Sequence, residues 1–165
     1  KIIKKLIPHS KNRSALVQTD NDQLDSLLVF NNALIINKDS LGTGFNQISG
    51  QKLYGNFVNN ELKKIDIIKN AESIYYLRNS ENELVGIDRS KSGKIQILLD
   101  NNSIEKFKKI NQIDGNTYPE DDFLEELKFL KGFYFREEEK PNSISDLFKD
   151  DPKLILTKIK SLQIN

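Results

Sequence analysis

Apolar and polar residues alternate along several stretches of this chain. The apolar positions that follow this spacing are Leu53, Gly55, Phe57, Ile65, Ile67, Ile95, Ile97 and Leu99. The polar positions that fall between them are Lys64, Asp66, Gln96 and Asp100. A period of two is the spacing of a β-strand with one buried face, and the β-branched residues in these stretches also favour strand. We therefore predict strands that turn one apolar face toward a core.

The alternating stretches recur as an internal repeat about forty residues long. Residues 62–74 match residues 24–36 at a shift of 38, with apolar positions and an Asn-Ala pair in register. Residues 52–62 match residues 94–104 at a shift of 42, with a pair of asparagines aligned. One copy cannot cover its own apolar face, so stacked copies must share a continuous core. The repeat predicts a mainly β, folded-over antiparallel sheet built of repeated hairpins.

Paired asparagines mark the joints of the predicted hairpins. The pairs are Asn31-Asn32, Asn59-Asn60 and Asn101-Asn102. Asparagine tolerates positive φ and can hydrogen-bond its own backbone, so such pairs between β-branched runs indicate tight turns or bulges. Residues 15–18 fit the opening strand of the first copy, and residues 79–83 fit a turn between two further strands.

The chain is long enough, at 165 residues, for one domain with a substantial core. We expect residues 1–13 to form an N-terminal strand or a frayed end. Residues 14–113 should form the domain of repeated hairpins. Residues 114–165 should form a C-terminal loop with short helices that pack on the sheet.

The character of the sequence changes in this C-terminal part. Residues 114–116 indicate a turn, and Pro119 followed by acidic residues indicates the start of a helix that ends at Gly132. The apolar stripe of this helix is Phe123, Leu127 and Leu130. Residues 143–148 fit a further short turn with a capping box, and residues 153–162 fit a last helix.

Composition narrows the function classes. The 25 basic residues nearly balance the 24 acidic ones, so no overall field draws the chain to nucleic acid or to an anionic membrane. Cysteine is absent, which removes disulfides, thiolate catalysis and cysteine metal sites. Methionine is absent as well, so a chain that begins at Lys1 is expected to be a processed or trimmed product of a longer one.

Catalytic and metal-binding motifs are weak. His9 is the only histidine and stands in a polar stretch, so we interpret it as a surface residue. Residues 42–47 begin like a dinucleotide loop but lack the third glycine, which favours a plain turn between strands. The carboxylates at 20, 22 and 25 lack the glycine and glutamate of a calcium loop. We therefore predict no enzyme, no metal and no cofactor.

Two groups of residues leave alternatives open. The lysines around Phe107, at 106, 108 and 109, could meet phosphate in nucleic acid or in a lipid A head group, or could simply protect an edge strand from aggregation. The tyrosines at 54, 75 and 76 could stack on sugars or pack in the core. The acidic groups at 120–126 and 137–139 are most simply solvated faces.

A series of short motifs resembles one family in order and spacing, from about residue 24 to residue 148. The motifs are Gly44-Phe45-Asn46-Gln47-Ile48-Ser49-Gly50, Leu53-Tyr54-Gly55, Asn60-Glu61-Leu62, Asn70-Ala71-Glu72-Ser73-Ile74-Tyr75-Tyr76, Asn82-Glu83-Leu84-Val85-Gly86-Ile87 and Tyr118-Pro119-Glu120-Asp121. Together they resemble the OstA-like (organic-solvent-tolerance) lipopolysaccharide-transport proteins of the Bacteroidetes type. At Phe135 and Glu137 this sequence departs from the family segment, in which we would expect tryptophan and glycine.

The resemblance implies a β-jellyroll of the "β-taco" kind, whose open groove holds the acyl chains of lipopolysaccharide in the periplasm. It also implies that edge strands pair with other envelope proteins of the same transport system or with further copies of the chain. The apolar residues that we expect to line the groove are Leu53, Phe57, Ile65, Ile67, Ile74, Ile95, Ile97 and Leu99. Equally, these side chains could pack against each other in a closed core.

Two other functions compete with the lipid carrier. A structural β-repeat scaffold of the cell envelope would have a filled interior and no ligand. A hydrolase of envelope glycans would use carboxylates such as Glu120 and Asp122 as acid and base, and it has the least support in the sequence.

Overall fold

The described part of the chain is mainly β and antiparallel, as the alternating pattern predicts. The computed structural model describes residues 2–3, 14–20, 23–101 and 103–135. The chain divides into two compact units, Lys1–Phe133 and Tyr134–Asn165, and every element described below belongs to the first. The strands are β1 (Ile2–Ile3), β2 (Ser14–Asp20), β3 (Gln23–Lys38), β4 (Phe45–Val58), β5 (Glu61–Arg78), β6 (Leu84–Asp100), β7 (Ser103–Ile110) and β8 (Asp114–Tyr118).

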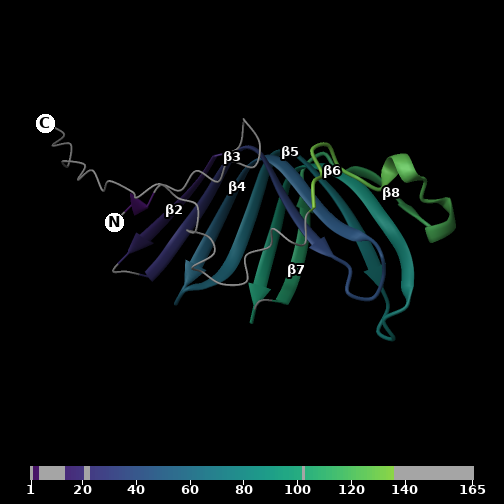
Figure 1. The fold of residues 1–165 in the computed structure, drawn as a ribbon, viewed down its shortest axis with the longest axis horizontal. Coiled ribbons are helices and arrows are strands. Elements are labelled where there is room, and N and C mark those ends of the chain that lie inside the picture. Colours follow the sequence, from purple (N-terminus) through teal and green to yellow (C-terminus); the bar gives the residue numbers. More distant parts are fainter. Residues whose placement is uncertain (1, 4–13, 21–22, 102, 136–165) are drawn as a thin grey trace, which may run out of the picture. The chain divides into compact units, whose positions relative to one another are not determined.

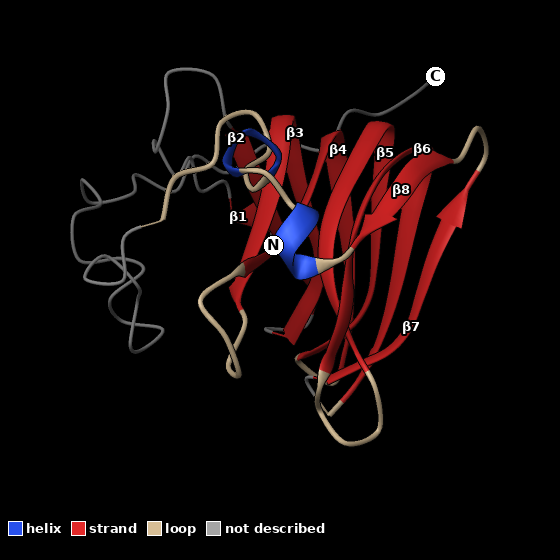
Figure 2. Cartoon of the chain, turned by 90° about the vertical axis from the view of Figure 1, so that its right-hand side faces the viewer, coloured by secondary structure: helices blue, strands red, loops and turns tan. Residues whose placement is uncertain are grey.

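Neighbouring strands follow the order of the chain. The sheet runs from β1 to β7 in sequence, and β8 pairs with β6 on the same edge as β7, farther along the strand (Figure 1). Asn59 and Asn60 form the turn between β4 and β5 with positive φ angles, and Asn79 begins the turn between β5 and β6, where its side chain accepts hydrogen bonds from two backbone amides. The predicted hairpin turns at these two places are confirmed. The helices of the described residues are two single turns of 3₁₀-helix, and Figure 2 shows helical turns in blue beside the sheet.

A line of irregular positions crosses the middle of the long strands. We call this line the crease. It consists of Asn31-Asn32 in β3, Gly50-Gln51 in β4, Lys69-Asn70 in β5, Gly93 in β6 and Asn111-Gln112 after β7. The strand register shifts at these positions between β3 and β4, between β4 and β5 and between β5 and β6, and such bulges bend a strand. The strands accordingly arch over at the crease in Figure 1.

The residue types at the crease fit this backbone. Asparagine reaches the left-handed region more easily than most residues, and Asn32 and Asn70 lie there with φ angles of 69° and 50°. Gly50 is required for a different reason: a Cβ at this position would lie 2.4 Å from Cγ2 of Ile67. The crease therefore depends on asparagine in alternate strands and on glycine in a strand between them.

The crease separates two parts of the sheet. We call the residues on the side of the Asn59-Asn60 turn the first limb, and those on the other side the second limb. Tyr75 in the second limb contacts Phe107 in the first, with ring centroids 5.6 Å apart. The register places Phe107 level with Ile65, ten residues from Tyr75 along β5, which is about 33 Å in a flat strand. The inner surfaces of the two limbs therefore face each other.

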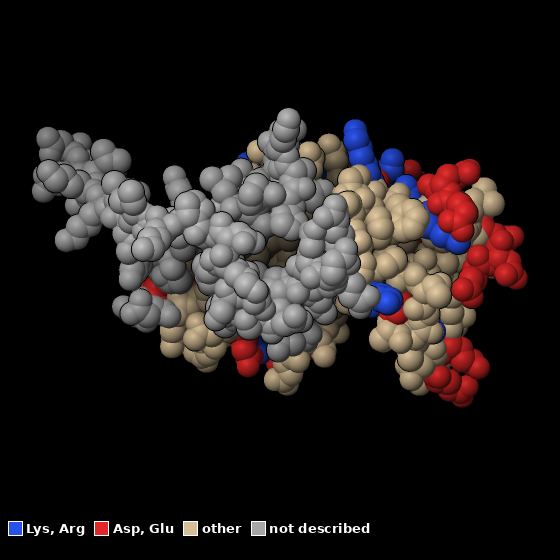
Figure 3. Space-filling model, viewed as in Figure 1, with Lys and Arg blue, Asp and Glu red and all other residues tan. Residues whose placement is uncertain are grey.

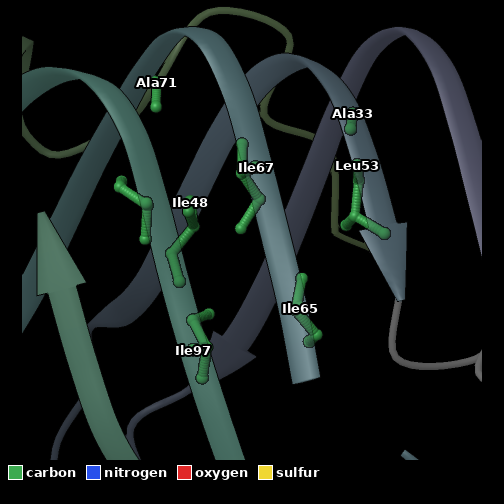
Figure 4. Close-up of a cluster of buried hydrophobic side chains, with 8 residues drawn as sticks. Ala33, Ile48, Leu53, Ile65, Ile67, Ala71 and Ile97 are labelled. Atoms are coloured by element: carbon green, nitrogen blue, oxygen red, sulfur yellow. The ribbon is translucent and has the colours of Figure 1, made fainter. Parts of the chain in front are cut away.

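Two hydrophobic cores lie on opposite faces of this sheet. The first core is on the inner face and consists of Ala33, Ile48, Leu53, Ile65, Ile67, Ala71, Ile95 and Ile97. Figure 4 shows these side chains beneath the arch of the strands, with Ala33 and Ala71 near the bend and Ile65 and Ile97 farther from it. The second core, on the outer face of the second limb, consists of Ile74, Ile87, Phe123 and Leu130.

Residues 119–133 run across that outer face, and we call them the strap. The buried amide of Gln47 fastens the strap to β4: Nε2 donates to the carbonyl of Lys128 at 2.7 Å, and Oε1 accepts from the backbone N–H of Leu130 at 2.9 Å. Arg89 of β6 donates a further hydrogen bond to the carbonyl of Leu127. These bonds satisfy backbone groups that an α-helix would pair internally.

Some boundary predictions for the C-terminal part are wrong. Residues 114–118 form β8 and not a turn, because they continue the ladder of β6 beyond the crease. The helix expected from Pro119 is replaced by two single turns of 3₁₀-helix, η1 (Glu120–Asp122) and η2 (Glu125–Leu127), because the strap follows the sheet surface in an extended path between them. Within the described residues, no helix is long and apolar enough to cross a membrane.

Other predictions fall partly or wholly outside the described residues. Within the N-terminal part, residues 2 and 3 pair with β2, and residues 4–13 lie outside the description. The short turn expected at 143–148 and the last helix expected at 153–162 also lie outside it. The strand expected near residues 15–18 is confirmed as β2.

Candidate functional site

The inner face of the first limb presents an apolar surface five strands wide. Strand register aligns two rows of residues across β3 to β7. The first row is Leu27, Gly55, Ile65, Ile97 and Phe107, and the second is Val29, Leu53, Ile67, Ile95 and Lys109. Residues level with one another on adjacent strands share a face. The predicted alternation of apolar and polar sides therefore holds across neighbouring strands.

Burial on the inner face of the sheet is deepest in the central strands β4, β5 and β6 and decreases toward the outer strands and the strand ends. Ile67 and Ile95 are fully buried against their neighbours, at 0% exposure. The side chains that pack around the first core are only partly buried, and they are Leu27, Val29, Ile35, Leu62, Leu99 and Phe107. We call these six residues the margin. The interior next to the crease is thus filled by the chain's own side chains, and the apolar surface that solvent reaches lies along the margin.

The eight residues predicted to line a groove do not all share this face. Five of them belong to the first core, namely Leu53, Ile65, Ile67, Ile95 and Ile97, and Leu99 belongs to the margin. Ile74 lies on the opposite face in the second core, because side chains alternate along β5 and those of Ala71 and Ser73 point inward. Phe57 is half-buried but belongs to neither core.

Polar side chains lie on the inner side of the second limb. Ser73 and Ser90 have their hydroxyl oxygens 3.1 Å apart, and Ser90 donates a hydrogen bond to Asp88 at 3.0 Å. Asp88 also forms an ion pair with Lys109, which comes from the first limb. The sequence pattern does not predict this group. Ser73 is two residues from Ala71 in the same strand, and only this spacing indicates that its polar side chain points inward.

The lysines near Phe107 therefore divide into two kinds. Lys106 and Lys108 are exposed, whereas Lys109 is about one-fifth exposed and pairs with Asp88 on the inner side. The two outward lysines remain available to an anionic partner or as charges that protect an edge strand.

The outer face of the first limb is polar and tied together by one carboxylate. Asp66 accepts a hydrogen bond from Gln96 at 2.9 Å and forms ion pairs with Lys94 at 2.9 Å and Lys64 at 3.1 Å. Burial opposes ionisation of Asp66, but the bonds from Gln96 and the two lysines outweigh it and lower the pKa of this carboxyl. Lys64, Asp66 and Gln96 thus lie on the face opposite the first core, as the alternation predicts.

One edge of the sheet has free backbone groups. In the part of the chain that the structure describes, β7 and β8 pair only with β6, so their far sides carry no ladder partner. An edge of this kind can pair with another extended segment.

The carboxylates of the strap are solvent-facing. Glu120 and Asp122 are exposed on η1, and Glu125 pairs with Lys128 at 2.6 Å. Figure 3 shows acidic side chains gathered at the end where Figure 1 draws β8 and the short helices. No group of three or more potential metal-ligating side chains occurs among the described residues. That the chain is not an enzyme stays a prediction.

Comparisons of the chain with protein-family models, with curated proteins and with solved structures find no match. The function of the chain is therefore inferred from the arrangement of its residues and from the resemblance in its sequence motifs.

Proposed function

We propose that this chain binds acyl chains of lipopolysaccharide in the periplasm, along the inner face of its sheet, and passes them toward the outer membrane. The observation that carries this proposal is the graded inner face. Its row Leu27, Gly55, Ile65, Ile97 and Phe107 is apolar across five strands, the side chains of the central strands are buried, and those of the margin are partly open to solvent. An apolar trough that opens on one side suits a chain of methylenes, which makes no directional bonds.

In this proposal the sheet is a folded-over β-jellyroll whose two limbs act as the walls of the trough. The bends at the crease and the contact of Tyr75 with Phe107 support this shape. Entry of an acyl chain would part the limbs at the margin and leave the crease intact. Each methylene that leaves water contributes about 0.8 kcal/mol, so several chains supply ample binding free energy without a catalytic group.

The free edge of β7 and β8 is the proposed site for partners. A neighbouring subunit or another envelope protein of the transport system would continue the sheet there by backbone hydrogen bonding. The trough would then extend from one subunit to the next. Exposed Lys106 and Lys108 on β7 would have to meet acidic residues or solvent at such a junction.

The test is thermal unfolding of the full chain with increasing lipid A. A ligand present at about 100 times its Kd adds about 2.7 kcal/mol of stability, which corresponds to a rise in Tm of roughly 5 to 10 °C for a domain of this size. Leu99→Glu, at the margin, should reduce this lipid-dependent rise. Asp100→Asn, at the exposed neighbouring position, should keep it. Absence of any rise in the wild-type protein would contradict the proposal.

A ligand-free envelope scaffold is the second candidate. It is favoured by the complete burial of Ile67, Ala71 and Ile95, which leaves no room for a ligand next to the crease. In a scaffold, the side chains of the margin would also pack against one another and leave no space for a ligand. It predicts the same Tm with and without lipid A, so the same titration separates the two candidates.

A further inference from the structure

A pocket of about 170 Å³ lies on the outer side of the second limb, away from the inner face. It is formed where the loop between β3 and β4 meets the ends of β5 and β6 and the strap. Its lining includes Asp39, Gly44, Tyr76, Arg78, Lys128 and Phe129. Nothing in the acyl-chain proposal requires this pocket.

The loop glycines are needed for the pocket to exist. A Cβ on Gly42 would lie 2.8 Å from Oδ2 of Asp39, and a Cβ on Gly44 would lie 2.1 Å from Cζ of Tyr76. Both contacts are shorter than any that real side chains make. The Gly-Thr-Gly stretch at 42–44 is therefore fitted around the Asp39 carboxylate and the Tyr76 ring.

Asp39 and Arg78 form the polar floor. Nη2 of Arg78 lies 2.5 Å from Oδ2 of Asp39, and Nη1 donates to the carbonyl of Asn82 at 2.7 Å. Nε of Arg78 is buried and has no hydrogen-bond partner among the described residues. A buried donor without a partner is costly, so a ligand oxygen that reached it would be favoured.

The charges that line the pocket cancel. Arg78 and Lys128 are matched by Asp39 and Glu120. The hydrogen bond from Arg78 lowers the pKa of Asp39, so this carboxyl is ionised at neutral pH. Burial raises the pKa of Tyr76, so its hydroxyl keeps its proton and can donate. A ligand with a net charge gains little here, whereas a neutral ligand with several hydroxyls can use donors and acceptors alike.

An aromatic surface stands at the rim. Phe129 is 45% exposed, and Phe133 packs between it and Phe45, with centroids 4.4 Å and 5.2 Å away. Such a ring can cover the apolar face of a small cyclic ligand. The volume is below the 300 Å³ or more typical of sites for larger ligands and fits one small ring.

We propose that this pocket binds one neutral sugar residue, so that the chain contacts glycan on its outer side. The sugar hydroxyls would bond to Asp39, Arg78 and the Tyr76 hydroxyl, and the ring would lie against Phe129. This arrangement gives the outer face a ligand chemistry distinct from that of the inner face.

The test is saturation-transfer NMR of the full chain with a panel of neutral hexoses and their methyl glycosides. At least one sugar should receive saturation, and the backbone amides of Gly42, Thr43 and Gly44 should shift as it is added. Phe129→Ala should weaken binding at least tenfold. Leu124→Ala, at an exposed strap residue outside the pocket, should bind as the wild type does.

Three results would overturn the proposal. They are no saturation of any neutral sugar, equal binding by Phe129→Ala and the wild type, and tighter binding of a uronic acid or an amino sugar than of the neutral parent. Each of these results leaves acyl-chain binding on the inner face untouched, because that is measured with lipid A.

Discussion

Lys109 of β7 pairs with Asp88 of β6 across the crease. The register places Lys109 level with Ile95, seven residues from Asp88, so in a flat sheet their backbones would be about 23 Å apart. This ion pair can form only because β6 bends at Gly93. The ion pair is therefore present only while the inner surfaces of the two limbs face each other.

Breaking this ion pair should destabilise the fold. Both side chains are about four-fifths buried, so removing one partner by Lys109→Met or Asp88→Asn should lower the free energy of unfolding by about 1 to 3 kcal/mol. Urea unfolding of both single variants and the double variant measures their coupling. Lys108→Met, at the exposed next position, should change stability by less than about 0.5 kcal/mol. Equal effects at 108 and 109 would contradict the pairing.

The crease should be sensitive to backbone conformation at Asn70. Its φ of 50° lies in the left-handed region, which a β-branched side chain tolerates poorly. Asn70→Val should therefore cost about 1 to 2 kcal/mol, whereas Asn70→Gly should be neutral or slightly stabilising. Chemical unfolding of the two variants provides the comparison. If both have the same stability, the bend does not require this conformation.

Gln47 should control the attachment of the strap. Gln47→Leu leaves the N–H of Leu130 and the carbonyl of Lys128 without their partner, at a cost of about 1 to 3 kcal/mol. Hydrogen exchange at the Leu130 amide should become faster. Gln51→Ala, at an exposed position of the same strand, serves as the control and should leave this amide protected. An unchanged exchange rate in Gln47→Leu would show that the second core holds the strap alone.

The Asp39–Arg78 pair should contribute to stability in a pH-dependent way. The hydrogen bond from Arg78 lowers the pKa of Asp39 below its ordinary value of 3.8. The contribution is therefore complete above that value and is lost as the pH falls through the lower value of the folded state. Asp39→Asn should be less stable than the wild type at pH 7, and the gap should narrow below about pH 4. A gap that stays constant from pH 7 to pH 3 argues against this ion pair.

The sequence predicts the faces of the strands well, because side-chain direction follows alternation alone. Ile65 and Ile67 share the inner face with Ile95 and Ile97 for this reason. The prediction that Ile74 lines the groove is wrong, because Ile74 is one residue out of step with Ala71 and Ser73 in β5 and so points to the outer face. Ile74 and Ile36 are level with Gln47 on the outer side.

The internal repeat also aligns two positions of the crease, although the sequence alone does not show that the strands bend there. The shift of 38 aligns Asn31-Asn32 with Lys69-Asn70, and both pairs lie at the crease. Asn59 and Asn60 also have positive φ angles, of 52° and 63°, but they form the turn that joins two strands. Pairs of residues with positive φ thus occur both at the crease and at a turn. Whether such a pair bends one strand or ends it depends on how the distant strands pair.

The strap and the outer pocket could not be predicted from periodicity. Phe123, Leu127 and Leu130 have helical spacing, but Gln47 takes the backbone bonds that a helix would need. The pocket combines a few residues each from β5, β6, the 39–44 loop and the strap. No pattern within one segment indicates such a set.

We propose that acyl chains lie against the inner face of the first limb. This proposal is tested most directly by placing a photoreactive phenylalanine analogue at position 107, on the inner margin, or at position 108, on the outer face of the same strand. Each protein is illuminated with lipopolysaccharide, and adducts are detected by mass spectrometry. If acyl chains lie against the inner face, a lipid adduct forms at position 107 and none forms at position 108. No adduct at 107, or equal adducts at both positions, would contradict this proposal.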